Sequence, residues 1–269
     1  MLSDRHYSDP DSEEKETELK ASALIDAILR EDGNSKTPNS EIKNDIVEEQ
    51  SQKKVLLIDH EDSFVHTLAN YLRQTGAEVV VCRSGKSLNQ FIAESVDTGA
   101  FHPDICVLSP GPGSPSDFFL SETIGNMISR KVPIFGVCLG LQGLFEYFGG
   151  ELGILGYPMH GKPSIISRVF SDVTEDGGQY AGPPMYDVLR GLPDQFQVAR
   201  YHSLHGTQNT LPASLVVTAS VDDVIMAIQH KSMPIAAVQF HPESLLTLPK
   251  NGMKILENAL EILSAKHYE

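Results

Sequence analysis

The stretch Phe135-Gly-Val-Cys-Leu-Gly-Leu-Gln-Gly143 decides the fold of this chain. It joins a short apolar run to a segment whose apolar residues have helical spacing, and Cys138 stands at the junction. Gly136 and Gly140 leave room for a sharp strand-to-helix turn. The N–H groups and the dipole at a helix start favour a thiolate. We therefore predict that Cys138 is a nucleophile at the carboxyl end of a buried strand.

Strand and helix patterns alternate on both sides of this turn. Continuous apolar runs are typical of strands buried on both faces. Their alternation with amphipathic helices predicts an α/β protein with an open, mostly parallel, doubly wound sheet. The expected segments are strands at 55–58, 79–81, 105–108, 134–137, 215–218, 224–229 and 235–238, helices at 63–75, 118–129 and 251–265, and a small antiparallel hairpin element at 151–168 and 185–200.

A base for the thiol is expected from Gln239-Phe-His-Pro-Glu-Ser244. His241 follows an apolar strand, so we expect it at the same edge of the sheet as Cys138. Pro242 restricts the backbone, and a turn can direct the carboxylate of Glu243 at the imidazole. Of the other histidines, we predict structural or solvent-exposed positions for His60, His66, His102 and His230.

An acyl-transfer site also needs hydrogen-bond donors for a developing oxyanion. The tight turn Ser109-Pro-Gly-Pro-Gly113 follows the strand at 105–108 and can present a backbone N–H. The backbone N–H of Leu139 is the second expected donor. Together with Cys138 and His241, these donors predict a thiol enzyme that transfers acyl groups.

The composition limits the partners and the location of the chain. A net charge of −15 argues against nucleic acid or anionic membrane as a partner. No apolar run reaches the roughly 18 residues that span a bilayer, and the first residues lack a signal-peptide pattern, so we expect a cytoplasmic protein. The three cysteines match no zinc pattern and no disulfide framework. We therefore expect no metal site.

Residues 1–52 differ from the rest of the chain. They hold 6 Lys+Arg and 14 Asp+Glu, a net charge of −8, whereas the other 217 residues carry −7. The stretch from Ser8 to Arg30 has the pattern of a helix, although its composition is equally consistent with a disordered segment. The following residues, up to 53, are predicted to be a flexible acidic linker.

The turn motifs at 109–113, 136–142 and 241–244 occur in the order and spacing of the class I (triad) glutamine amidotransferases, which the chain resembles over roughly residues 54–265. The resemblance implies a flavodoxin-like fold, L-glutamine as substrate and no cofactor in this domain. It also implies that Cys138, His241 and Glu243 are the nucleophile, the base and the orienting carboxylate. The implied glutamine-binding residues are Gly111, Pro112, Gly113, Leu139, Gln142, Ser203 and Leu204.

Three more stretches resemble the amidotransferase of anthranilate synthase: Ile58-Asp-His-Glu-Asp-Ser-Phe64, Met159-His-Gly-Lys162 and Arg200-Tyr-His-Ser-Leu204. The overlapping stretch Asp59-His-Glu-Asp-Ser-Phe-Val-His66 is similar to forms fused behind their synthase in one polypeptide. The resemblance implies that the chain supplies ammonia for converting chorismate to anthranilate in tryptophan biosynthesis. It also implies that a chorismate-binding synthase domain or subunit is the partner and that His160 and Lys162 face it.

The acidic front segment fits such a fusion. Glu16 and Lys20 match the Glu-Thr-x-x-Lys-Ala helix at the end of chorismate-binding synthases. The resemblance implies that 1–30 is the remnant of that C-terminal helix, 31–53 a linker and 54–269 the amidotransferase domain. Mg²⁺ is then expected only in the absent synthase domain.

Other functions remain open at this stage. The same elbow occurs in amidotransferases for aminodeoxychorismate or phenazine-type synthases, and also in γ-glutamyl hydrolases, which act on peptide-like substrates without a partner. A non-enzymatic alternative is a docking or relic module from an interrupted fusion.

Overall fold

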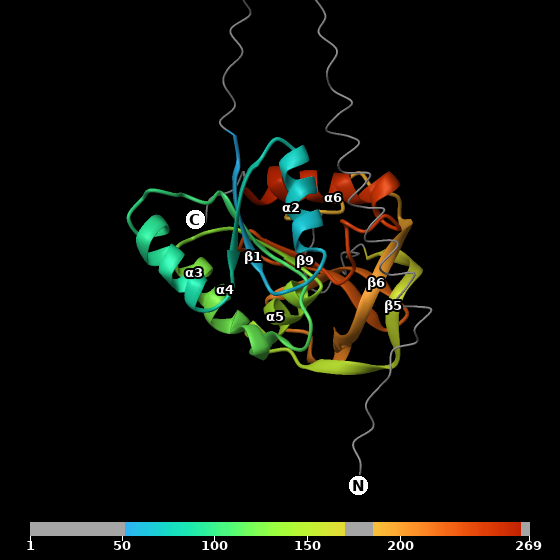
Figure 1. Ribbon diagram of the computed structural model, residues 1–269. Coiled ribbons are helices and arrows are strands. Elements are labelled where there is room, and N and C mark those ends of the chain that lie inside the picture. The colour runs from blue at the N-terminus through green and yellow to red at the C-terminus, as the bar shows by residue number, and fades with distance from the viewer. Residues whose placement is uncertain (1–51, 170–184, 265–269) are drawn as a thin grey trace, which may run out of the picture.

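The computed structural model describes residues 52–169 and 185–264. Within these residues, nine strands form one sheet in the order β2-β1-β3-β4-β9-β8-β7-β5-β6 (Figure 1). The first five pair in parallel, and the last four extend the sheet from β9 through antiparallel pairs. The bounds are β1 Lys54–Asp59, β2 Glu78–Arg83, β3 Ile105–Leu108, β4 Ile134–Val137, β5 Leu152–Arg168, β6 Gln195–Gly206, β7 Leu215–Val221, β8 Val224–His230 and β9 Ile235–Val238.

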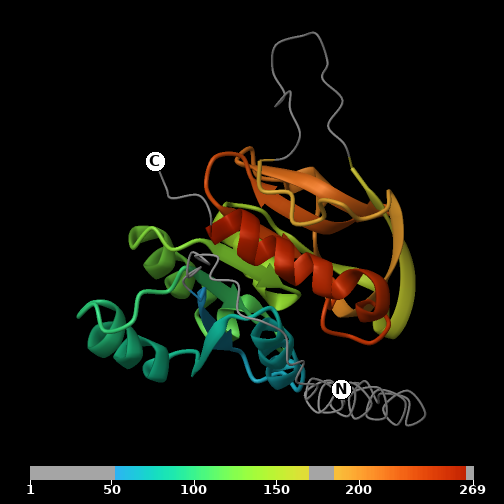
Figure 2. The same cartoon turned by 90° about the horizontal axis from the view of Figure 1, so that it is seen from above.

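Helices cover both faces of the parallel half (Figures 1 and 2). Side chains of α2 and of the last helix, made of α6 and η5, share one core with the sheet, whereas those of α3, α4 and α5 share the other. The doubly wound α/β fold is therefore confirmed. The bounds are α2 Val65–Gln74, α3 Lys86–Phe91, α4 Leu120–Ser129, α5 Leu139–Tyr147 and α6 Met253–Asn258, with shorter helices η1 Ile92–Val96, η2 Pro115–Phe118, η3 Gln208–Thr210, η4 Leu248–Gly252 and η5 Ala259–Leu263.

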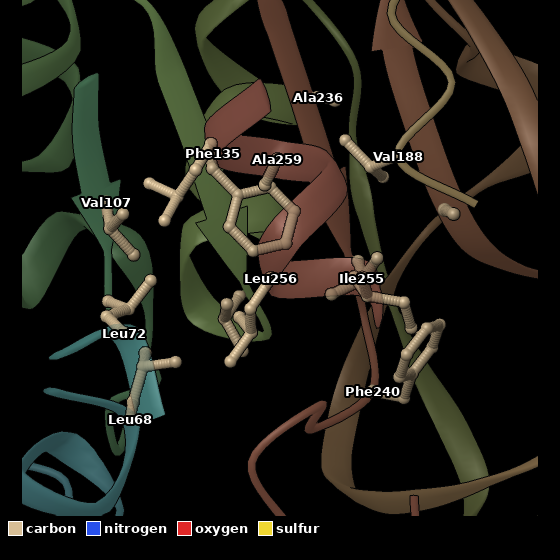
Figure 3. Close-up of a cluster of buried hydrophobic side chains, with 14 of the residues drawn as sticks. Leu68, Leu72, Val107, Phe135, Val188, Ala236, Phe240, Ile255, Leu256 and Ala259 are labelled. Carbon is tan, nitrogen blue, oxygen red and sulfur yellow. The ribbon is translucent and has the colours of Figure 1, made fainter. Parts of the chain in front are cut away.

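Alternate residues of the central strands supply the two cores. In β4, Phe135 belongs to the core under α2 and the last helix, and Ile134 to the opposite core. Figure 3 shows Phe135 in one cluster with side chains that include Leu72 of α2 and Ala259 of the last helix. Burying a side chain of this size contributes about 1.5–3 kcal/mol. Because both faces of β4 are buried, its sequence is continuously apolar, and Cys138 starts from a rigid support.

The antiparallel half of the sheet contributes residues beside the carboxyl end of β4. β5 and β6 form the predicted hairpin, and β7 and β8 join it to β9, so the antiparallel part is larger than the hairpin alone. The register of β5 shifts between Ile154 and Met159 and again between His160 and Lys162. Such irregularities bend a strand. Met159 and His160 lie at this bend and line the pocket that contains Cys138.

The second hairpin strand begins later than predicted. The sequence predicts it at 185–200, but β6 runs from Gln195 to Gly206, and the residues before it form turns. Tyr186 and Val188 are buried there, and their spacing of two residues mimics the alternation of a strand. The Tyr186 N–H donates to the side chain of Gln229 at 3.1 Å, and Asp187 accepts from the Leu189 N–H at 3.0 Å, so side chains stabilise these turns.

A helix after β2 is not expected from the sequence. Within α3, only Leu88 is buried, and Ile92 continues the same contact into η1. This pair is too short a pattern to indicate an amphipathic helix.

The predicted front helix and nearly all of the linker lie outside the described residues, and the division at residue 54 stays a prediction. In the described ranges 52–169 and 185–264, no helix is long and apolar enough to cross a bilayer.

Candidate active site

Cys138 lies on the sharp turn between β4 and α5, and its backbone is strained. Its φ and ψ angles are 52° and −97°, a region that residues with a side chain rarely adopt. Its N–H donates to the carbonyl of Val238 in β9 at 2.8 Å, which fixes the turn. Such strain costs on the order of 1–3 kcal/mol and is typical of functional sites. The predicted elbow is present, with Cys138 only 5% exposed.

The two flanking glycines allow α5 to sit directly on the strand ends. A Cβ on Gly136 would lie 2.7 Å from the backbone carbon of Gly140, and a Cβ on Gly140 would lie 2.7 Å from the carbonyl oxygen of Leu108. Real Cβ atoms essentially never come this close. The first N–H groups of a helix lack partners within the helix, and that of Leu139 belongs to this group. It is therefore suited to donate a hydrogen bond to a negatively charged atom nearby.

His241 and Glu243 form a buried pair just after β9. Nδ1 of His241 donates to Oε1 of Glu243 at 2.7 Å, and the side chains are 2% and 0% exposed. Burial by itself lowers the pKa of His241. The charge of Glu243, followed by hydrogen bonding to Cys138 and to Glu243, more than offsets burial, so the pKa is raised well above its ordinary value. The pair therefore favours an imidazolium beside the thiol.

The His241 ring is held in place from several sides. The His241 N–H donates to the carbonyl of Ala199 in β6 at 3.1 Å. The rings of Phe64 and Tyr201 pack against the imidazole, with centroids 5.2 and 5.0 Å from its own. Within the described residues, its buried Nε2 makes no well-aligned hydrogen bond, although Cys138 acts on its pKa. This nitrogen is thus the one available to exchange a proton with the reacting groups.

A pocket of about 260 Å³ opens over Cys138. It contains all but one of the predicted glutamine-binding residues; the exception is Leu139, whose side chain is buried in the core. In the loop after β3, Gly113 has a φ of 69°, and a Cβ on Gly111 would lie 2.5 Å from Leu139 Cδ2, so both positions require glycine. The lining residues are Gly111, Pro112, Gly113, Cys138, Gln142, Met159, His160, Tyr201, His202, Ser203 and Leu204.

Two residues near the thiol are not assigned a role from the sequence. Gln239 is fully buried, and its side-chain amide donates to Cys138 Sγ at 3.5 Å. His202 is 5% exposed and lines the pocket, and burial lowers its pKa to about 3. Both belong to motifs that the sequence does single out. Their place in those motifs is therefore the only sequence signal that could have indicated a role for them.

Other features of the described residues compete poorly as a reaction site. A larger hollow of about 600 Å³ lies between the start of α4 and the end of α5, but no thiol or imidazole lines it. His60 is structural, as predicted: it is buried against Ser109, and burial lowers its pKa to about 4. Across the described residues, no group of His, Cys, Asp and Glu side chains has the arrangement of a metal site.

Comparisons with known proteins show the family of this chain. The family model for glutamine amidotransferase class I matches residues 56–262. An "Anthranilate synthase" of Azospirillum brasilense is 44% identical over 98% of this chain, and the chain spans only 32% of that protein's length. An "Anthranilate synthase component 2" of Methanothermobacter marburgensis is 39% identical over 78% of this chain and 99% of that protein.

Solved structures show the same fold. A protein of Thermoplasma acidophilum, provisionally assigned as part of a GMP synthase, superimposes with a TM-score of 0.63 at 22% identity, covering 80% of this chain and 95% of that one. At this identity the likeness supports the fold alone. The family match covers most of the chain, and the Cys138 turn and the His241–Glu243 pair lie within the matched residues. This chain belongs to the class I glutamine amidotransferase family.

Proposed function

We propose that this chain hydrolyses the side-chain amide of L-glutamine and that the ammonia serves a chorismate-binding synthase that forms anthranilate. One observation carries the glutaminase part. A strained cysteine lines one small pocket, and the buried His241–Glu243 pair interacts with this thiol in a way that favours the imidazolium. These are the nucleophile, base and orienting group that thiol acyl transfer needs.

In the proposed reaction, the Cys138 thiolate attacks the amide carbon of glutamine, and the N–H groups of Gly113 and Leu139 donate to the oxyanion. Protonated His241 gives its proton to the leaving nitrogen, so ammonia departs and a γ-glutamyl thioester remains. Neutral His241 then takes a proton from water as the water oxygen attacks the thioester. Collapse of this second intermediate releases glutamate and restores the thiolate and the imidazolium.

The pocket supports a small substrate. Its volume of about 260 Å³ is below the roughly 300–1,000 Å³ of sites for drug-sized ligands. This size favours a free amino acid over the peptide-like substrates of γ-glutamyl hydrolases. Residues of the loop after β3, together with Ser203 and Leu204, line the pocket and are proposed to bind the polar ends of glutamine.

Two observations support the anthranilate pathway and the synthase partner. Relatives named for anthranilate synthase match the chain at 37–44% identity. Beside the pocket, Ile154 and Tyr157 of β5 are 79% and 69% exposed, and the Lys162 ammonium lies 4.1 Å from the centre of the Tyr157 ring. Exposed apolar side chains next to a reaction site are typical of a docking surface. The synthase is expected to cover them.

Glutamate release by the purified chain tests the glutaminase part. We expect slow turnover of glutamine and none by Cys138→Ala, whose circular dichroism should match the parent. Turnover by the alanine variant would exclude Cys138 as nucleophile. Activity on folate polyglutamates without a partner would favour a γ-glutamyl hydrolase instead.

Product analysis tests the pathway. We expect no anthranilate from chorismate and glutamine with the chain alone, and anthranilate when a synthase component I lacking its amidotransferase is added. Aminodeoxychorismate formation with its own synthase, and none of anthranilate, would overturn the pathway assignment while leaving the glutaminase intact.

A further inference from the structure

Gln239 directly precedes the Phe-His-Pro-Glu segment and makes a contact that the triad does not explain. Its side chain is fully buried, and Nε2 lies 3.5 Å from Cys138 Sγ. A neutral thiol is a weak acceptor, but a hydrogen bond to an ionised group is roughly twice as strong as a neutral one. The contact therefore stabilises the thiolate more than the thiol.

We propose that Gln239 is a further catalytic residue, which donates a hydrogen bond to the Cys138 thiolate and is kept in the donating orientation by a relay of buried polar groups. The proposal rests on the proposed thiol chemistry. The relay runs from Gln239 through Gln142, the Leu204 carbonyl and His202 to Arg200.

The first part of the relay decides which end of the Gln239 amide faces the sulfur. Nε2 of Gln142 lies 3.5 Å from Oε1 of Gln239 and 3.1 Å from the Leu204 carbonyl oxygen. An amide nitrogen only donates, so Oε1 of Gln239 is turned toward Gln142. Its NH₂ group then points at Cys138. The reversed amide would put oxygen against a thiolate, which is repulsive.

The second part fixes the Leu204 carbonyl. Nε of Arg200 donates to Nε2 of His202 at 3.0 Å, and Nδ1 of His202 lies 2.9 Å from the Leu204 oxygen. Because a guanidinium cannot accept, Nε2 of His202 is the acceptor and Nδ1 carries the proton. Burial keeps His202 neutral, with its pKa lowered to about 3. The Leu204 oxygen, with two lone pairs, can accept from both His202 and Gln142.

These contacts assign two kinds of role. Gln239 contacts the reacting sulfur, whereas Arg200, His202 and Gln142 act on the sulfur only through Gln239. His202 and Gln142 also line the pocket. His202 is therefore a positioning residue. Its loss should affect glutamine binding and the thiolate together.

The test is the pH dependence of Cys138 alkylation by iodoacetamide, followed by mass spectrometry of its own peptide so that Cys82 and Cys106 do not contribute. For Gln239→Met, we expect the midpoint of the curve to move up by about one pH unit, and kcat/KM for glutamine to fall about tenfold. Gln229→Met is the matched control. Gln229 is also buried but bonds the Tyr186 N–H, so its loss should lower the melting temperature and leave the midpoint unchanged.

A midpoint in folded Gln239→Met equal to that of the parent would overturn the proposal. If that variant does not fold, Gln239→Asn carries the same test, because it keeps an amide but withdraws the donor by one methylene. For the relay, His202→Leu should shift the midpoint in the same direction, and His202→Asn, which retains an N–H donor, should partly restore it. Alkylation needs no substrate, so the result stands even if glutamine proves not to be the substrate.

Discussion

Replacing Glu243 by glutamine isolates the charge of the carboxylate that orients His241. The substitution keeps the side-chain volume and an oxygen that can accept the 2.7 Å hydrogen bond from Nδ1. Hydrogen bonds to charged groups contribute about 1.5–3 kcal/mol and neutral ones about 0.5–1.5 kcal/mol, so the loss is about 1–2 kcal/mol. If the transition state carries an imidazolium, kcat/KM for glutamine should fall about 5- to 30-fold.

The pH profile gives a second measure of the same change. Without the carboxylate, burial dominates, and the pKa of His241 falls from its raised value. The imidazolium then loses its proton at a lower pH, so the alkaline limb of the kcat/KM profile should shift to lower pH. The raised pKa of His241 also affects the free energy of unfolding of the parent. Its stabilising contribution is complete below the unfolded pKa of about 6.5 and is lost as pH rises through the folded pKa.

The assay is initial-rate glutamate release between pH 6 and 9, with the fold checked by circular dichroism. Glu261→Gln is the matched control, because Glu261 forms a 2.9 Å ion pair with Arg190 at the surface and should tolerate the change. The reasoning is refuted if folded Glu243→Gln keeps the kcat/KM and the alkaline limb of the parent.

Two further predictions concern stability. Gly140→Ala should lower the free energy of unfolding by about 1–3 kcal/mol, because its Cβ would lie 2.7 Å from the Leu108 carbonyl oxygen. Gly156→Ala, a position with open space around it, should not lower it, and urea titrations of the two variants make the comparison. The folded-state pKa of His60 is lowered to about 4, so the unfolded chain binds its proton first as pH falls from 6.5 to 4, and stability drops by roughly 3 kcal/mol over this window. His60→Asn should flatten that dependence in urea titrations at several pH values; an unchanged slope would contradict the assignment.

Most of the parallel half could be predicted from the sequence. Strands such as Ile105–Leu108 and Ile134–Val137 are buried on both faces, so burial leaves a continuous apolar run. The elbow is predictable because steric room around Cys138 demands glycines at fixed positions. Gly113, Gln142 and Ser203 line the pocket as their motifs imply.

The rest depends on contacts between distant segments. The start of β6 is predicted too early because Tyr186 and Val188 are buried through turns that side chains stabilise. The orientation of Gln239 depends on Gln142, and that of His202 on Arg200, so neither has a local signature. The residues 1–51, on which the inference of a synthase remnant rests, lie outside the described part of the chain.

The position of β9 has a consequence for when the site becomes competent. β9 pairs with β4 on one side and β8 on the other, so it is the seam between the two halves of the sheet. Cys138, the proposed nucleophile, sits on one side of this seam, and His241, its proposed base, follows 103 residues later in the chain. During synthesis, the elbow emerges from the ribosome well before His241 does. The thiol therefore acquires its proposed proton partner only when β9 pairs with β4, and the proposed glutamine turnover depends on this pairing.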